Sequence, residues 1–291
     1  MKRFTIDLHG PLHGLDFGGE GPLVLLVHGL GGSSINWAAV GEDLTTHGHV
    51  MALDLPGFGR TPPAGRSAAI DDQAALIAEF VEHVADRPAM VIGNSMGGLI
   101  AMLLAARRPD LVDRLVLVDP AAPSWSPTAV NRGWALMMGV YLLPGVNKVM
   151  FNALQRRGSP EQRTAVAMEL IAANGSRVSD HMKRLHADVA RERDHMPWVA
   201  EAFLEAYKSI AKRLAVPSRY YRIVHRIMAP TLLMHGIVDS IVPFSAAQRL
   251  ASQRPDWTFV PLEDTGHVPQ LEAGEKFIKV VAEFVGDHQQ V

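Results

Sequence analysis

The sequence predicts an α/β fold in which a doubly wound, mostly parallel sheet is interrupted by an all-helical insertion. Short, nearly continuous apolar runs rich in Val and Leu recur along the chain, as in strands that are buried on both faces of a parallel sheet. Segments with helical patterns separate these runs, and such alternation favours parallel pairing. From about Pro120 to about Ile227 no comparable run occurs. We therefore expect a core of residues 1–120 and 228–291 and a helical cap of residues 121–227.

Eight segments are expected to form the sheet. Two short strands, at residues 2–8 and 13–17, predict an antiparallel hairpin at one sheet edge. The six apolar runs that follow predict the buried strands, at residues 23–29, 49–55, 89–94, 114–119, 231–236 and 257–262.

Helices are expected between these strands and in the cap. Apolar residues at helical spacing predict helices over residues 70–85, 96–108 and 270–285. In the cap, Ser159 is followed by Pro and, three residues on, by Gln, which is a capping-box start. Gly175 marks the expected end of that helix.

Composition and charge exclude several classes of partner. The 291-residue chain is 48% hydrophobic and 20% charged, with a net charge of -2, so no global field would recruit nucleic acid. The apolar runs are too short to cross a bilayer, which argues against stable membrane insertion. The cap helices are basic-leaning. A solvated helix face explains this most simply; the alternatives are recruitment of an acidic partner or substrate and docking to anionic lipid.

Cysteine content and the first residues of the chain indicate the cellular compartment of the protein. The chain has no cysteine, which excludes disulfides and a thiolate nucleophile and fits a reducing compartment. The first ten residues lack the apolar segment of a signal peptide. We therefore expect a cytoplasmic protein, either a monomer or a homodimer.

A serine flanked by glycines carries the main chemical signal. Gly93, Ser95 and Gly97 form the pattern G-x-S-x-G between an expected strand and an expected helix, the context of a nucleophile elbow. In such a turn the serine adopts a strained backbone conformation, and flanking side chains would collide with the neighbouring strand and helix. The sequence therefore predicts that Ser95 is a nucleophile above the sheet.

A serine nucleophile needs a base and a group that orients the base. His267 follows the last expected strand, and Asp239 follows the strand before it. Asp119 ends the strand before the cap and is the alternative acid, because either carboxylate could reach the imidazole. The order Ser, Asp, His is the one found in α/β-hydrolases.

These segments together resemble the α/β-hydrolase superfamily from about Gly21 to about Val285. The match includes "HGLGG" (28–32), "DLPGFGRT" (54–61), "GNSMGG" (93–98), "HGIVDSIVP" (235–243) and "GHVPQLE" (266–272). The resemblance implies that the backbone N–H groups of Leu30 and Met96 form an oxyanion hole, with Gly29 and Gly31 keeping its loop free of side chains. His28 is expected to bond to the loop backbone instead of taking part in catalysis.

Further residues are candidates for support of the triad or for the substrate pocket. Asn94, Val242 and Val268 adjoin the catalytic loops. Trp134 and Met138 lie in an apolar run at the start of the cap, where helical spacing favours a place in the cap core over a pocket wall.

A serine at the elbow predicts acyl transfer to water without a metal or an organic cofactor. We expect hydrolysis of carboxylic esters with a largely apolar acyl group. A C–C bond hydrolase of the meta-cleavage type is the alternative, because "GNSMGG" resembles that family's elbow. That family usually has Arg beside the acid and Trp after the histidine, where this chain has Ser240 and Val268. Thioesterase and perhydrolase activity stay open, as does a receptor-like protein with slow turnover.

Overall fold

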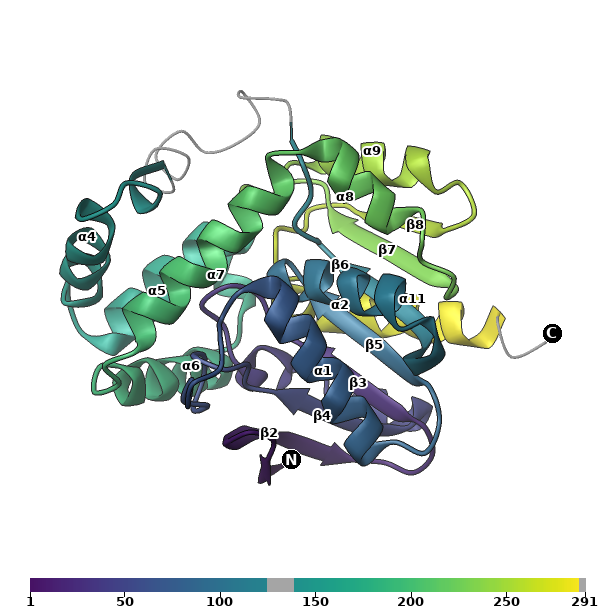
Figure 1. The fold of residues 1–291 in the computed structure, drawn as a ribbon, viewed down its shortest axis with the longest axis horizontal. Coiled ribbons are helices and arrows are strands. Elements are labelled where there is room, and N and C mark those ends of the chain that lie inside the picture. Colours follow the sequence, from purple (N-terminus) through teal and green to yellow (C-terminus); the bar gives the residue numbers. More distant parts are fainter. Residues whose placement is uncertain (125–138, 288–291) are drawn as a thin grey trace.

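A single sheet of eight strands forms the centre of the molecule (Figure 1). The computed structural model describes residues 1–124 and 139–287. The strands lie in the spatial order β1-β2-β4-β3-β5-β6-β7-β8. Their bounds are Lys2–Asp7 (β1), Pro11–Gly18 (β2), Leu23–Val27 (β3), His49–Leu53 (β4), Ala89–Asn94 (β5), Val112–Val118 (β6), Thr231–Gly236 (β7) and Thr258–Leu262 (β8).

The strand pairings confirm the predicted doubly wound sheet. β1 pairs antiparallel with β2, and β2 pairs antiparallel with β4, so the hairpin lies at one edge. All other neighbours pair parallel. Successive side chains of a strand point to opposite faces, and accordingly Leu25 and Val27 join one core cluster while Val24 and Leu26 join the other. Apolar layers therefore cover both faces, which explains the continuous apolar runs.

Helices cover the two faces of the sheet and form the segment between β6 and β7. In the described part of that segment every regular element is helical, and Figure 1 shows α4, α5 and α6 at one end of the sheet. The α-helices are Ile70–Val84 (α1), Met96–Arg107 (α2), Val146–Gln155 (α4), Pro160–Ile171 (α5), Asp180–Arg193 (α6), Val199–Leu214 (α7), Pro217–Val224 (α8), Phe244–Gln253 (α9), Pro269–Glu272 (α10) and Gly274–Asp287 (α11). Short 3-10 helices are Ser34–Trp37 (η1), Asp43–His47 (η2), Pro109–Leu111 (η3) and Gly175–Arg177 (η4).

The structure differs from two helix predictions, and tertiary contacts explain one of the differences. The capping box at Ser159 is present, but α5 ends at Ile171, four residues before Gly175. The carbonyl of Leu170 accepts a hydrogen bond from the Ser240 hydroxyl at 2.7 Å, and that of Ile171 accepts one from the His267 N–H at 2.7 Å. Loops of the core thus bond to the last carbonyls of α5. The expected helix 270–285 is divided at Ala273, whose backbone is not helical.

The topology brings the loops that carry chemistry to one edge of the sheet. β4 lies on one side of β3 and β5 on the other, so the chain reverses its direction of winding between β3 and β5. Ligands bind at such switch points, outside the carboxyl ends of the strands. The loops after β3 and β5 begin there, at His28 and Ser95. No helix within residues 1–124 and 139–287 is long and apolar enough to cross a membrane.

Candidate active site

Ser95 occupies a strained turn between β5 and α2. Its φ is +57° and its ψ is -117°, a region that side chains rarely adopt. A Cβ on Gly93 would lie 2.4 Å from the Gly97 carbonyl oxygen, and one on Gly97 would lie 2.2 Å from the Val27 carbonyl oxygen. Only glycine fits at these two places. The glycine pattern thus lets α2 start directly behind β3 and leaves Ser95 at the turn.

His267 and Asp239 form a buried hydrogen-bonded pair. The His267 Nδ1 lies 2.7 Å from the Asp239 Oδ2, and the side chains are 8% and 0% exposed. The Asp239 Oδ1 accepts hydrogen bonds from the Ile241 N–H at 2.7 Å and the Val242 N–H at 3.0 Å. Burial alone would raise the pKa of Asp239, but the charge and hydrogen bond of His267 lower it below its usual value, with smaller contributions from His235 and Ile241. The carboxylate is therefore ionised and holds the imidazole by one nitrogen.

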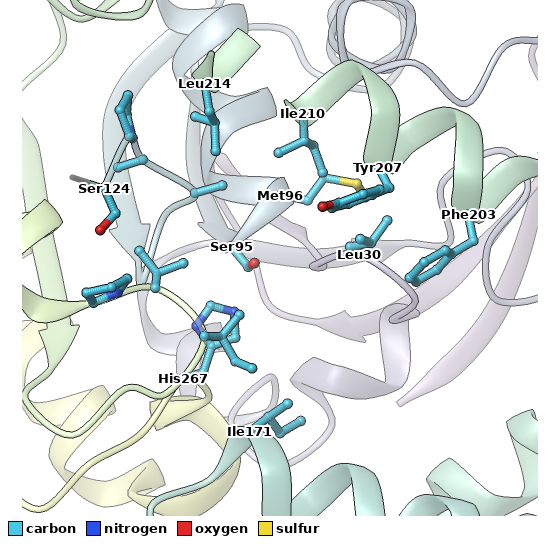
Figure 2. A pocket seen from close by; sticks show the side chains of 16 residues that line it. Leu30, Ser95, Met96, Ser124, Ile171, Phe203, Tyr207, Ile210, Leu214 and His267 are labelled. Carbon is cyan, nitrogen blue, oxygen red and sulfur yellow. The ribbon is translucent and has the colours of Figure 1, made fainter. Parts of the chain in front are cut away.

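Ser95 and His267 line the same cavity, which has a volume of about 460 Å³ (Figure 2). Figure 2 shows both side chains near the middle of the cavity wall, with Tyr207 and Ile210 projecting from α7. Because Nδ1 of His267 is bonded to Asp239, Nε2 is the nitrogen left for a reaction. The other lining residues are mostly apolar: Leu30, Met96, Ala121, Ala122, Pro123, Ser124, Ile171, Phe203, Leu214, Ile241, Val242 and Pro243.

The loop after β3 is held by the side chain of His28. The Leu55 N–H donates to the His28 Nε2 at 3.1 Å, so Nδ1 carries the proton and donates to the Gly29 carbonyl at 2.7 Å. Burial lowers the pKa of His28, which favours this neutral tautomer. Gly31 has a φ of +74°, and its carbonyl accepts a hydrogen bond from Arg193 of α6 at 2.6 Å.

The two donors expected for an oxyanion hole lie beside Ser95. Leu30 and Met96 both line the cavity with Ser95. A Cβ on Gly29 would lie 3.1 Å from the Ser95 Cβ, so the loop approaches the serine closely. Met96 is the first residue of α2, where a backbone N–H has no partner within the helix.

Asp119, the alternative acid, lies near the pair but bonds elsewhere. Its Oδ1 accepts a hydrogen bond from the Gly236 N–H at 2.8 Å. The His267 Nδ1 bonds to Asp239. Of the two candidate acids, the structure therefore brings Asp239 to the imidazole.

The remaining candidates are divided between support, pocket and core. The Asn94 amide donates to the carbonyls of Val118 and His267, each at 3.0 Å, so it links the elbow to the histidine loop. Val242 lines the cavity. Val268 is 2% exposed and packs in the core cluster that contains Val24 and Leu26. Trp134 and Met138 lie outside the described residues.

Helix α7 contributes four residues to the cavity wall, none of which was expected from the sequence to line a pocket. Phe203, Tyr207, Ile210 and Leu214 of α7 all line it. Their spacing of four, three and four residues is that of one helix face. This apolar stripe on α7 is visible in the sequence. The sequence alone does not reveal that α7 is the helix that faces the loops of Ser95 and His267.

One buried cluster offers atoms that could bind a metal ion. A single ligand atom each from Asp119, His235 and Asp239 lies within 4.8 Å of the others. Most atoms of the three side chains are engaged, because the His235 Nε2 bonds to the Val242 carbonyl at 2.9 Å and both Asp239 oxygens accept hydrogen bonds. In this cluster, the Asp119 Oδ2 and the His235 Nδ1 are the atoms without a hydrogen-bond partner among the described residues, and two ligand atoms are fewer than a structural metal site uses.

Comparisons with known proteins identify the family of the chain. A family model described as the alpha/beta hydrolase fold matches residues 22–274. A pimeloyl-(acyl-carrier protein) methyl ester esterase from Chromobacterium violaceum is 30% identical over 269 residues, which cover 91% of this chain and 94% of that protein. A 2-hydroxy-6-oxononadienedioate/2-hydroxy-6-oxononatrienedioate hydrolase from Cupriavidus pinatubonensis is 26% identical, over 97% of this chain and 92% of that protein. The solved structure of a membrane phospholipase A, described as a bacterial virulence factor, superposes with a TM-score of 0.76 at 27% identity, over 100% of this chain and 87% of that chain.

Proposed function

The chain is a hydrolase of the α/β-hydrolase family, and we propose that it cleaves carboxylic esters through an acyl-enzyme formed on Ser95. The observation that carries the proposal is the shared cavity. Ser95, in its strained turn, and His267, held by Asp239, both face a space lined mainly by apolar side chains. Such a constellation is defined by geometry and roles.

The proposed mechanism assigns one step to each group. His267 Nε2 takes the proton of the Ser95 hydroxyl as the serine oxygen attacks the ester carbonyl. The N–H groups of Leu30 and Met96 stabilise the negative charge on the carbonyl oxygen. His267 then gives its proton to the departing alcohol. It removes a proton from the water that attacks the acyl-enzyme and returns it to the Ser95 oxygen as the acid departs. Asp239 stabilises the imidazolium in both halves of the reaction.

Pocket chemistry supports a largely apolar acyl group. The cavity volume of about 460 Å³ lies within the range of small-molecule sites. Its wall from α7 offers aliphatic and aromatic side chains, and the relative from Chromobacterium violaceum is by name a methyl ester esterase. We therefore propose that the substrate of this chain is also a carboxylic ester, with a largely apolar acyl group.

Residues 121–227 are proposed to act as a cap over the carboxyl edge of the sheet. Ile171 and the α7 stripe line the cavity from this segment. Ion pairs and hydrogen bonds join it to the core, among them Arg60 with Glu192 at 2.6 Å and Arg213 with Asp71 at 2.7 Å. The cap is therefore a wall of the site that is tied to the core at several points.

Hydrolysis of a chain-length series of p-nitrophenyl esters tests the proposal. Wild type should cleave them, and Ser95→Ala should lose turnover by about a millionfold, as other triad knockouts do. Ser124→Ala is the matched control, because Ser124 lines the same cavity and has no step in the mechanism. Turnover of a meta-cleavage product alone would favour the C–C hydrolase. If wild type turns over neither substrate, a receptor-like protein is favoured.

A further inference from the structure

Behind the His267–Asp239 pair lies a second carboxyl group that the mechanism does not use. Asp119 is fully buried, with its backbone at a φ of +46°. Among residues other than glycine, Asn and Asp tolerate this conformation best. The Asp119 N–H donates to the Met234 carbonyl at 3.0 Å, so the strained residue is fixed at the end of β6, beside β7.

The polar atoms around Asp119 are mainly acceptors. The Gly236 N–H donates to its Oδ1, but Oδ2 has no partner among the described residues. His235 Nε2 must be protonated, since it lies 2.9 Å from the Val242 carbonyl, which can only accept. In the neutral ring Nδ1 is then an acceptor, 3.6 Å from the Asp119 Oδ1. Asp239, the third member of the cluster, is an ionised acceptor.

We propose that Asp119 is a positioning residue that keeps a proton at neutral pH and donates it in a hydrogen bond to the carboxylate of Asp239. The inference rests on the proposed function for its catalytic meaning. A proton on Oδ2 supplies the donor that the acceptors around it lack. An unpaired carboxylate in this place would be costly, because a buried charge needs a partner.

The electrostatics of the cluster agree with a neutral Asp119. Burial raises the pKa of Asp119 well above its usual value, and the negative charge and adjoining carboxyl group of Asp239, together with the charge of Glu272, raise it further. The hydrogen bond from Gly236 acts in the opposite direction. Burial also lowers the pKa of His235, so the ring does not supply the missing positive charge.

A neutral Asp119 would serve the triad in two ways. It would give the Asp239 carboxylate a further donor, in addition to His267 and the N–H groups of Ile241 and Val242. It would also keep a single negative charge behind the imidazole, since two ionised carboxylates this close repel each other.

Replacement of Asp119 by its neutral isostere tests the proposal. Asn suits the backbone conformation, can accept from Gly236 and can donate to Asp239. Asp119→Asn should therefore keep kcat/KM within about tenfold of wild type, with the acid limb of its pH profile unmoved. If Asp119 were ionised in wild type, loss of its charge would move that limb to lower pH by about one to three units. Either that shift or a folded but inactive Asn variant overturns the proposal.

Infrared spectroscopy of the full chain provides a readout that does not depend on activity. At neutral pH, the difference spectrum of wild type minus Asp119→Asn should contain the carbonyl band of a protonated carboxylic acid. A carboxylate band in its place overturns the proposal even if the variant is active. Because this measurement needs no substrate, a failure of the proposed ester hydrolysis is distinguishable from a failure of the proposal for Asp119.

A second variant separates positioning from mere filling of space. Asp119→Ala removes the donor to Asp239, so kcat should fall well below that of Asp119→Asn while KM changes little. Equal kcat in the two variants would contradict a positioning role. If Asp119→Ala does not fold, the Asn variant and the infrared spectrum still test whether Asp119 carries a proton.

Discussion

The floor and the roof of the cavity differ in chemistry and in origin. The floor consists of loops at the carboxyl edge of the sheet, where Ser95, Asp239 and His267 are fixed by backbone hydrogen bonds and by one another. The roof is an apolar face of α7, represented by Phe203 and Ile210 (Figure 2). This difference predicts that the reaction and the choice of substrate depend on separate segments. Substitutions should therefore be able to change one without the other.

Apart from loss of the Ser95 hydroxyl, the largest expected effect is at the floor, with loss of the charge that stabilises the imidazolium. Asp239→Asn should lower kcat by about ten-thousandfold, because the isosteric amide cannot stabilise that cation and favours the wrong tautomer. Steady-state kinetics on the best p-nitrophenyl ester measure this. The matched control is Asp264→Asn, because Asp264 is an exposed aspartate on the loop that carries His267. Comparable losses in the two variants would contradict a specific role for Asp239.

A substitution in the roof should change selectivity instead. Ile210→Trp adds bulk to the cavity wall, so kcat/KM for long acyl chains should fall by about tenfold or more relative to short ones, since one methylene in an apolar pocket is worth about 10- to 200-fold. The ratio of kcat/KM across the ester series measures this. Lys208→Trp, on the exposed side of the same helix, should leave the ratio unchanged. A uniform loss for all esters after Ile210→Trp would mean that roof and floor are not separable.

The smallest expected effect concerns stability of the cap in acid. Burial lowers the pKa of His186, on α6, to about 4, and the unfolded value is about 6.5. Between pH about 6.5 and about 4, the His186 imidazole is protonated in the unfolded state but not in the folded state. Acidification over this range therefore lowers the free energy of unfolding by at most about 3 kcal/mol through His186. His186→Phe should lose less stability than wild type over the same range, as measured by thermal unfolding.

His181→Phe is the control for this comparison, because His181 is an exposed residue of the same helix. It should retain the acid sensitivity of wild type. If His186→Phe and wild type lose stability in parallel on acidification, His186 is not the group that titrates.

Sequence patterns are informative about the floor for a physical reason. The strands β3, β5, β6 and β7 are continuous apolar runs, and parallel pairing brings their carboxyl ends to one edge. The residues after them, such as Ser95 and Asp239, must therefore lie near each other. The edge hairpin and the parallel, doubly wound sheet follow from the same local patterns.

Other features depend on contacts that no local pattern encodes. Asp119 and Asp239 both follow strands at the same edge, and only the folded loops decide which carboxylate meets His267. Likewise α5 ends at Ile171 through contacts with the core. The stripe on α7 identifies an apolar face but not its partner, because helix packing sets the position of a cap helix.

Covalent labelling with a fluorophosphonate tests the central claim most directly. The probe reacts with an activated serine, so mass spectrometry of the digested protein should find one adduct, on the peptide that contains Ser95. Labelling should disappear in Ser95→Ala and persist in Ser124→Ala. Folded wild-type protein that remains unlabelled, or that carries the adduct on another serine, would contradict the assignment of Ser95 as the nucleophile.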